Sequence, residues 1–566
     1  MSAPRPRVVV VGAGFGGLAA TRALAKVPVD VVLVDRQNYH GFWPLLYQVA
    51  TAALSPDDVA YSVRGIFQRQ RNLEVRMASV DDIDLEAREL ELDQGPALAY
   101  DHLILAAGSV STDFGVPGVA QHAFPLKTVP DAVRLRHHVL RQFESACSHP
   151  SLMADGALTV VVAGGGPTGV EISGAMAELF GKVLAKDFRS NGEAAQARVV
   201  LVEPGDHLLN GFSARSQAQA LRTLTKLGVE VRFHTSIAAV SEHAVELGDG
   251  TAIPTRTLVW GAGIKANPLA ERLGLAPASG GRVPVEPDLS LPGHPEVFVI
   301  GDLALVTDDH GKPLPQLAPV ASQGARHAVR SVRRRMRGEP TSSFRYRDKG
   351  SMATIGRRSA VAELPGGIRL GGTLGWLSWL GLHLAFLVGF RNRVVVMVSW
   401  GWNFLTSDRG SRVILETDGA ASRGLSHGRP PSPASRRPAH ARGLTPSSPR
   451  SLEKHVPKGG PYVESKARPF KPVRMAIYAI VTLTVIVTIA WMQHHYPPHQ
   501  PLGALKVARF PASQRYPQLA YLYYGVVALI DATVIALVVR RSRRHRPSSV
   551  TTSSMPIESR SSTAAA

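Results

Sequence analysis

The sequence opens with a pattern that strongly constrains the fold. Four consecutive valines, Val8–Val11, suit a buried parallel strand, and a helical run over residues 18–26 follows. A second apolar run over residues 29–34 ends in Asp35. Strand, helix and strand in this order predict a βαβ unit. A G-x-G-x-x-G motif connects the first strand to the helix through Gly12, Gly14 and Gly17.

Each glycine of this motif has a separate physical task. Gly12 allows a tight turn, Gly14 lets the main chain approach a pyrophosphate, and Gly17 lets helix and strand pack closely. The helix N-terminus offers N–H groups and partial positive charge to phosphates, and Asp35 is placed to accept hydrogen bonds from a ribose. The alternative, a glycine-rich turn in some other α/β protein, does not explain the flanking strands and the acid.

The same unit occurs a second time. An apolar run over residues 158–163 leads into a second G-x-G-x-x-G motif, and a strand over residues 198–203 ends in Glu203. Pro167 falls near the helix start, where a missing N–H costs little. The connection before residue 198 is longer than in the first copy, which indicates an insertion. A carboxylate at Glu203 suits a free ribose 2′-OH and repels a 2′-phosphate, so NAD(H) is favoured over NADP(H).

Three further strands end in residues suited to line a cofactor. Residues 100–109 contain Ala107 and Gly108 near their end, and residues 258–265 contain Ala262 and Gly263 near theirs. Small residues there let a cofactor lie against the main chain. The strand at 295–300 precedes Gly301 and Asp302. Two dinucleotide sites in one chain predict that one holds a flavin and the other brings a nicotinamide against it.

Length and composition limit the classes of function. A chain of 566 residues predicts two or three domains. The net charge of +20 could serve nucleic acid or an anionic membrane, but the excess lies around apolar segments near the C-terminus. No nucleic-acid-binding signature is present, so we expect a lipid bilayer as partner and no nucleic acid. The single cysteine, Cys147, excludes an intrachain disulfide and any mechanism with paired cysteines.

These motifs resemble those of the type II NADH dehydrogenases, flavoproteins that pass electrons from NADH to membrane quinone. The P-L-L-Y-Q-V-A-T segment at 44–51 and the G-F-R-N-R segment at 389–393 are the most specific. The resemblance covers roughly residues 5–415. It also draws on residues 8–17, Asp35, 164–171, 260–263, 301–302, 314–324 and 372–388.

The resemblance implies FAD in the first fold and NADH in the second. The FAD-contacting residues are then Gly12, Gly14, Phe15, Gly16, Gly17, Asp35, Arg36, Ala50, Thr51, Val80, Ala107, Gly108 and Asp302. The NADH-contacting residues are Gly164, Gly166, Pro167, Thr168, Gly169, Glu203, Ala262 and Gly263. No metal site is expected.

The resemblance also implies two catalytic positions. It places Glu171 near the contact of nicotinamide and flavin, although an acid in a first helical turn also has a purely structural use against the helix dipole. Many relatives carry Ala-Gln-x-Ala-x-Gln where this chain has residues 318–323. The second Gln is present as Gln323, and Pro319 replaces the first. We expect both to border the quinone site, with its polar contacts altered at Pro319.

The predicted fold class is α/β, with two Rossmann-like dinucleotide-binding domains like those of the pyridine nucleotide-disulfide oxidoreductases. The expected domains are 1–155 and 286–345 for FAD, 156–285 for NADH and 346–418 for membrane anchoring. A disordered basic linker at 419–470, a transmembrane hairpin at 471–546 and a disordered tail at 547–566 complete the chain.

Several apolar segments predict membrane attachment. Residues 376–390 are apolar but short for a span, and they suit a helix lying in the interface, with a buried core helix as the alternative. Residues 475–492 and 519–539 are long enough to cross, and Asp531 is an intramembrane acid of open role. The basic flanks of this hairpin place the catalytic domains on the cytoplasmic side of the cell membrane.

The expected function is electron transfer from NADH through FAD to a membrane quinone, without ion pumping and with a homodimer as a possible assembly. The alternatives are an FAD reductase for a protein acceptor and an NADH-binding redox sensor. A sulfide:quinone oxidoreductase is disfavoured because that chemistry needs paired cysteines.

Overall fold

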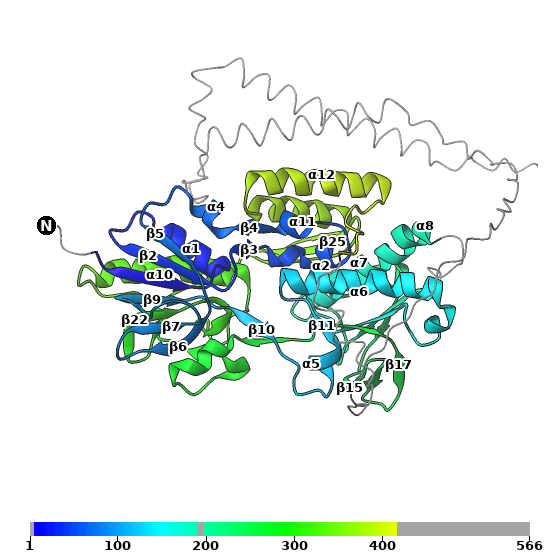
Figure 1. Cartoon of the computed structure of the whole chain (residues 1–566), viewed down its shortest axis with the longest axis horizontal. Coiled ribbons are helices and arrows are strands. Elements are labelled where there is room, and N and C mark those ends of the chain that lie inside the picture. The colour runs from blue at the N-terminus through cyan, green and yellow to red at the C-terminus, as the bar shows by residue number, and fades with distance from the viewer. Residues whose placement is uncertain (1–4, 189–195, 416–566) are drawn as a thin grey trace, which may run out of the picture. The chain divides into compact units, whose positions relative to one another are not determined.

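The computed structural model describes residues 5–188 and 196–415, which belong to one compact unit, Met1–Ala441 (Figure 1). The predicted basic linker, the transmembrane hairpin with Asp531 and the C-terminal tail lie outside the described residues. Within the described ranges, no helix combines the length and the apolar character that crossing a bilayer requires.

The first sheet joins strands from two distant parts of the chain. Its order is β21-β22-β9-β1-β2-β5, and every pair is parallel except β21 with β22. Helices α1 (Phe15–Leu24) and α10 (Ala318–Arg335) pack against each other beside this sheet (Figure 1). The strands are β1 (Arg7–Val11), β2 (Asp30–Asp35), β5 (Leu73–Met77), β9 (His102–Leu105), β21 (Ser290–Leu291) and β22 (His294–Val299).

The second sheet repeats the parallel βαβ arrangement, in the order β11-β18-β12-β13-β14. Helix α7 (Pro167–Glu178) follows β12 and continues into a π-helical segment, Leu179–Leu184. The long helix α6 (Val129–Ser148) covers the same region. The strands are β11 (Ala123–Pro125), β12 (Thr159–Ala163), β13 (Arg198–Val202), β14 (Val229–Arg232) and β18 (Thr257–Trp260), and α9 (Ala214–Lys226) precedes β14.

The two sheets confirm the predicted α/β dinucleotide-binding class. Their valine-rich strands are buried on both faces, which is why their sequences are continuous apolar runs rather than alternating patterns. Strand β5 ends at Met77, and β6 (Val80–Asp84) then starts a small antiparallel sheet. That sheet also contains β7 (Glu89–Leu92) and β8 (Leu98–Ala99).

The last described part is an antiparallel sheet of β24 (Ser351–Gly356), β25 (Ser359–Leu364) and β26 (Ile368–Gly371), which α11 (Gly372–Phe386) covers. The chain turns at Gly389, whose φ is +88°, into a second helix, α12 (Phe390–Thr406). The predicted helix at 376–390 therefore ends earlier, at Phe386, and α12 was not predicted. The β-branched residues at 394–398 within α12 favour a strand, so the sequence gives no clear helical pattern there.

The short elements complete the fold. They are β3 (Tyr39–Gly41), α2 (Leu46–Ala50), α3 (Pro56–Val59), β4 (Ala60–Ser62), α4 (Val63–Phe67), β10 (Ser109–Ser111), α5 (Val119–His122), α8 (Ala185–Asp187), β15 (Ile237–Val240), β16 (Ala244–Leu247), β17 (Ala252–Pro254), β19 (Ile264–Ala266), β20 (Val283–Pro284) and β23 (Ala304–Leu305). The β10–β19 ribbon lies between the two large sheets (Figure 1).

Candidate active site

The first glycine turn has no room for side chains at its narrow points. Gly12 has φ +99°, and a Cβ there would lie 2.5 Å from the carbonyl oxygen of Ala106. A Cβ on Gly17 would overlap the carbonyl oxygen of Gly12. Gly14 differs, because no atom lies within 4 Å of the position of its Cβ. The turn is thus closed against its own strand and open on the side where a phosphate would approach.

The residues around this turn fit a bound dinucleotide. Gly14 is the N-cap of α1 and supplies no side-chain cap, which leaves the first N–H groups of the helix available to an anion. Asp35 accepts hydrogen bonds from the N–H groups of Ala13 (2.5 Å) and Gln37 (2.7 Å). Burial raises the pKa of Asp35, and these two hydrogen bonds oppose that shift. The acid therefore fixes the shape of the turn, and its contact with a ribose stays a prediction.

The second turn repeats this geometry closely. Gly164 has φ +96°, and a Cβ on Gly169 would overlap its carbonyl oxygen. Glu203 accepts hydrogen bonds from the N–H groups of Gly165 (2.5 Å) and Gly205 (2.8 Å), as Asp35 does in the first copy. Helix α7 starts at Pro167 after an N-cap glycine without a side-chain cap. The acid at the end of the second strand has the same structural task in both copies.

The remaining predicted cofactor residues lie near these turns or at the ends of neighbouring elements. Ala107, Gly108 and Asp302 follow β9 and β22 at the carboxyl edge of the first sheet, beside β1. Ala262 and Gly263 follow β18, next to β12. The others occupy these positions: Phe15 and Gly16 begin α1, Arg36 follows β2, Ala50 and Thr51 end α2, Val80 begins β6 and Thr168 lies in the first turn of α7.

A pocket lies where α2 and α7 meet the C-terminal sheet and helices. Glu171 and Tyr47 line it from the nucleotide-binding side. Helices α11 and α12 provide its aromatic wall, which consists of Trp376, Trp379, Trp400 and Phe404. The pocket therefore combines an acid, a phenol and an apolar wall, which are the features of a site for an aromatic ligand of low charge.

Glu171 has little to stabilise a negative charge. Its Oε1 accepts one hydrogen bond, from the N–H group of Thr354 at 3.3 Å. Desolvation raises the pKa of Glu171 to about 8, and the Thr354 hydrogen bond lowers it only in part. The charge of Glu171 in turn raises the pKa of Tyr47, after burial as the larger cause. At neutral pH the glutamate therefore carries a proton inside the pocket.

Tyr47 is held by a chain of hydrogen bonds that reaches α12. Gln48 Nε2 donates to the hydroxyl of Tyr47 at 2.8 Å. The indole of Trp400 donates to Gln48 Oε1 at 2.7 Å. The amide of Gln48 thus orients the phenol and connects it to the aromatic wall. The sequence reading quoted Tyr47 and Gln48 within a motif but assigned them no role.

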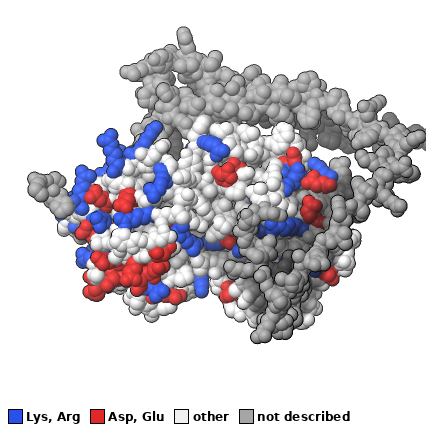
Figure 2. Space-filling model, in the orientation of Figure 1, with Lys and Arg blue, Asp and Glu red and all other residues white. Residues whose placement is uncertain are grey.

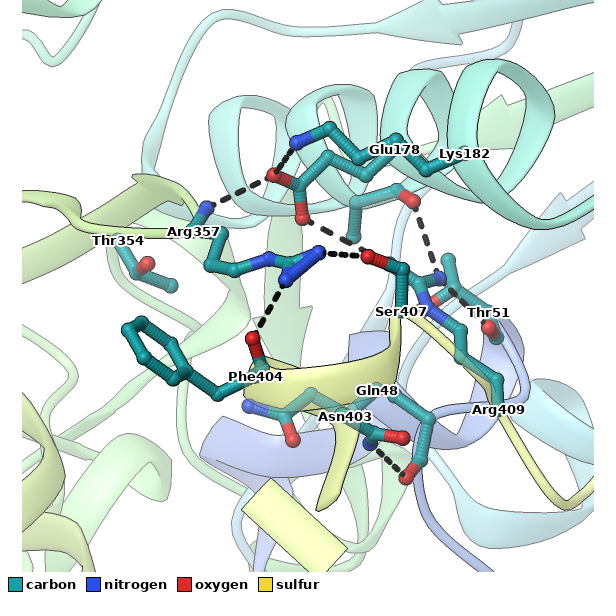
Figure 3. Close-up of polar contacts among 12 residues, drawn as sticks. Gln48, Thr51, Glu178, Lys182, Thr354, Arg357, Asn403, Phe404, Ser407 and Arg409 are labelled. Carbon is teal, nitrogen blue, oxygen red and sulfur yellow. Dashed lines mark hydrogen bonds and ion pairs between the residues drawn. The ribbon is translucent and has the colours of Figure 1, made fainter. Parts of the chain in front are cut away.

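The far end of the pocket is a network of charges around Glu178 (Figure 3). Lys182 Nζ lies 2.8 Å from Glu178 Oε1, which also accepts the N–H of Arg357 at 3.0 Å. Arg409 lies 3.7 Å from Glu178 Oε2 and donates to the carbonyl oxygens of Thr51 (2.7 Å) and Ala175 (3.2 Å). The guanidinium of Arg357 donates to the carbonyl oxygen of Phe404 and the hydroxyl of Ser407. The sequence reading missed this network.

The two residues expected at the quinone end lie on α10 and do not line this pocket. Gln323 donates to the carbonyl oxygen of Arg347 at 2.9 Å and accepts its N–H at 3.1 Å. Its amide is therefore occupied by the main chain of another segment. Pro319 is in the first turn of α10, where a helix has no use for an N–H, so the replacement of Gln is compatible with the fold. Their contact with quinone stays a prediction, and it would have to occur outside this pocket.

Comparison with known proteins agrees with this geometry. Residues 6–325 match the pyridine nucleotide-disulphide oxidoreductase family, and residues 349–408 match the NDH2 C-terminal domain. Fold and turns thus define a pyridine nucleotide-disulphide oxidoreductase. Type II NADH:quinone oxidoreductase NdhA of Mycobacterium tuberculosis is 39% identical over 427 residues, which is 72% of this chain and 89% of that protein. The chain belongs to the type II NADH:quinone oxidoreductase family.

More distant relatives share the same region. The internal alternative NAD(P)H-ubiquinone oxidoreductase A1 of Arabidopsis thaliana is 30% identical, over 72% of this chain and 86% of that protein. The structure of NDH2 from Plasmodium falciparum in complex with NADH is similar in fold, with a TM-score of 0.65 and 20% identity over 73% of this chain and all of that one. The sulfide:quinone oxidoreductase of Aquifex aeolicus shares the fold at 17% identity (TM-score 0.55; 69% and 92% covered).

Proposed function

We propose that this chain is an FAD-dependent enzyme that oxidises NADH and reduces a membrane quinone without moving ions. The observation that carries the proposal is the pocket that Glu171 and Tyr47 line together with an aromatic wall from α11 and α12. It adjoins α7, the helix that starts at the second glycine turn. This position supports the proposal that the pocket takes quinone beside the nicotinamide of NADH. Family membership supports the same activity.

We assign one cofactor to each glycine turn. The first turn and Asp302 hold FAD, and the second turn holds NADH with Glu203 at its adenosine ribose. FAD supplies the step between a two-electron donor and a quinone. The balanced reaction converts NADH, one proton and quinone to NAD⁺ and quinol. The protein therefore has to position three partners, exclude water and provide protons.

Glu171 is the proposed source of a proton within the pocket. With a pKa of about 8 it is protonated at pH 7, and it lines the pocket from the side of α7. Formation of quinol consumes two protons on its oxygens, so an acid that keeps its proton at neutral pH suits this step. The hydroxyl of Tyr47, oriented by Gln48, is a second hydrogen-bond donor for a quinone oxygen.

The outer side of the C-terminal helices supports attachment to a membrane. Leu374, Leu377 and Phe386 of α11 and Val398 and Trp402 of α12 are each more than half exposed. Figure 2 shows few charged side chains over this part of the surface, whereas Lys and Arg gather over α4. Such a face suits insertion into the interface of a bilayer, from which quinone enters. We further propose that the catalytic domains dock on the cytoplasmic side of the membrane and that residues 471–546 are a further anchor. A homodimer is part of the same proposal.

The test is anaerobic stopped-flow absorbance on the full-length protein in detergent. NADH is expected to bleach the flavin, and a soluble quinone is expected to restore its colour rapidly. Bleaching without reoxidation by quinone, together with fast reduction of a ferredoxin, would replace quinone by a protein acceptor. In liposomes, NADH oxidation is expected to build no membrane potential, and a potential would contradict the absence of ion pumping.

A further inference from the structure

Lys127 lies at the junction of the two nucleotide-binding folds. Its main chain belongs to the second fold, because it follows β11, which pairs in parallel with β18. Its side chain reaches the first fold. Lys127 Nζ donates to Ser109 Oγ at 2.8 Å and lies 3.8 Å from Asp302 Oδ2. Figure 1 shows β10 between the two sheets and β11, the edge strand of the second sheet, next to it.

The main chain of Lys127 is fixed by the start of α6. Thr128 is the N-cap of this 20-residue helix and forms a capping box with Asp131. The carboxylate of Asp131 accepts the N–H of Thr128 at 2.9 Å and also that of Lys127 at 3.3 Å. A lysine whose backbone is held in this way, with a side chain 28% exposed, differs from an ordinary surface lysine.

The ammonium group of Lys127 has more hydrogen-bond donors than its neighbours have acceptors for. A lysine carries three N–H donors, and among the described residues Ser109 provides the one acceptor within hydrogen-bond distance. Ser109 Oγ in turn donates to Asp302 Oδ2 at 2.6 Å. Desolvation lowers the pKa of Lys127, and the charge of Asp302 opposes that shift. The three side chains form a relay from the second fold to the edge of the first.

This edge is where FAD is assigned. Ser109 and Asp302 follow β9 and β22, whose carboxyl ends adjoin the glycine turn after β1. A bare carboxylate at Asp302 would repel a nearby diphosphate, and the repulsion is large where water is scarce. A cation held against Asp302 offsets this repulsion and fixes the direction of the carboxylate oxygens.

We propose that Lys127 is a positioning residue for FAD, which reaches from the NADH fold to hold Asp302 and to balance its charge at the cofactor edge. The proposal rests on the assignment of FAD to the first fold. It predicts that the effect of Lys127 passes through Asp302. It also predicts that Arg at position 127 retains FAD, whereas an apolar side chain of similar length does not.

The experiment measures the rate of FAD release from the full-length holoprotein on dilution, by the fluorescence of free flavin. Lys127→Met is expected to release FAD at least about tenfold faster, and Lys127→Arg to restore most of the retention. Arg141→Met is the control, because it removes the same charge from an exposed position of α6. In an Asp302→Asn background, Lys127→Met is expected to add little, since both changes disrupt one interaction.

Other outcomes overturn the proposal. Equal FAD release with a lower melting temperature would make Lys127 a structural link between the folds. Fully additive effects of Lys127→Met and Asp302→Asn would show that Lys127 does not act through Asp302. Failure of the proposed function is separate, because it would appear as a wild-type protein that holds no FAD, or as a flavoprotein that does not react with quinone.

Discussion

Two glutamates on α7 line the same pocket but differ in the hydrogen-bond and charge partners around them. Glu171 and Glu178 are seven residues apart, which is two helical turns, so they lie on one face of the helix. Glu178 has Lys182, Arg409 and the N–H of Arg357 around it. Glu171 has one N–H group at 3.3 Å.

The difference teaches that burial and partners together decide the role of an acid in this pocket. Two cations, Lys182 and Arg409, and the backbone N–H of Arg357 surround the carboxylate of Glu178, so its charge holds α7 to the segments that carry Arg357 and Arg409. The carboxyl of Glu171 lacks a cation among the described contacts and keeps its proton to about pH 8. One acid is therefore structural, and the other is available for chemistry.

The largest expected effect comes from Glu171→Gln, which keeps the shape and removes the exchangeable acid. Reoxidation of the flavin by quinone is expected to slow by about 10²–10⁴-fold, the usual contribution of a general acid, while bleaching by NADH changes less. Stopped-flow absorbance separates the two steps. The wild-type rate of reoxidation is expected to fall as pH rises through about 8, and the variant is expected to lose this dependence.

Asp187→Asn is the matched control for this variant. It also removes one carboxylate, but from an ion pair with Arg412 at 3.0 Å outside the pocket. Its reoxidation rate is expected to equal that of the wild type. If Glu171→Gln reoxidises as fast as this control, Glu171 provides no proton and the contrast with Glu178 loses its functional meaning.

Comparison of the wild type with Glu171→Gln also predicts a pH dependence of folding stability. The pKa of Glu171 is about 8 in the folded protein against 4.5 for an ordinary glutamate, so between these values the folded state binds more protons. Folding stability from this group is therefore complete below about pH 4.5 and is lost as pH rises through about 8. Melting temperatures of wild type and Glu171→Gln are expected to diverge in favour of the variant as pH rises. Parallel curves would contradict the raised pKa.

Arg409→Met is expected to have the largest effect on stability alone. It removes the cation facing the buried Glu178 and two hydrogen bonds, to Thr51 and Ala175, that link the end of α2 to α7. Breaking a buried pair of this kind costs about 3–5 kcal/mol. Arg412→Met is the control, because its ion pairs are partly exposed and are expected to contribute less than about 1 kcal/mol. Denaturant unfolding measures both, and equal losses would contradict the special place of Arg409.

These residues also show what the sequence reveals. The position of Glu171 follows from the second glycine motif, because the motif fixes the start of α7. The pairing of Glu178 with Lys182 could have been found from its spacing of four. The contact of Glu178 with Arg409 joins residues far apart in the chain, and no local periodicity encodes it.

The fold likewise has elements that local sequence patterns predict and elements that depend on distant contacts. Valine runs and glycine turns predicted both sheets, since those patterns follow from backbone geometry. Helix α12 was missed because its β-branched residues favour strands locally, and its place is set by distant contacts. Asn392, for example, donates to the carbonyl oxygens of Asp57, Asp58 and Ala60.

Trp400→Phe is expected to have a moderate effect on the chemical side of the pocket. It removes the hydrogen bond to Gln48, worth about 1 kcal/mol, and so loosens the orientation of Tyr47. The KM for quinone is expected to rise about fivefold, with the KM for NADH unchanged. Trp402→Phe is the control on the same helix, because Trp402 is 58% exposed. Equal changes in both variants would indicate that α12 acts through general packing.

The smallest expected effect is that of Lys182→Met, which removes one partner of the structural acid Glu178. Lys182 lies close to Glu178, at 2.8 Å, but its side chain is 42% exposed, so water competes for the charge. Exposed pairs four residues apart contribute about 0.3–0.5 kcal/mol, and Arg409 and the N–H of Arg357 remain to hold the carboxylate. Unfolding in denaturant is expected to shift by no more than this, with quinone kinetics unchanged. A loss as large as that of Arg409→Met would mean that the number of cations around Glu178, rather than the burial of one, holds the three segments together.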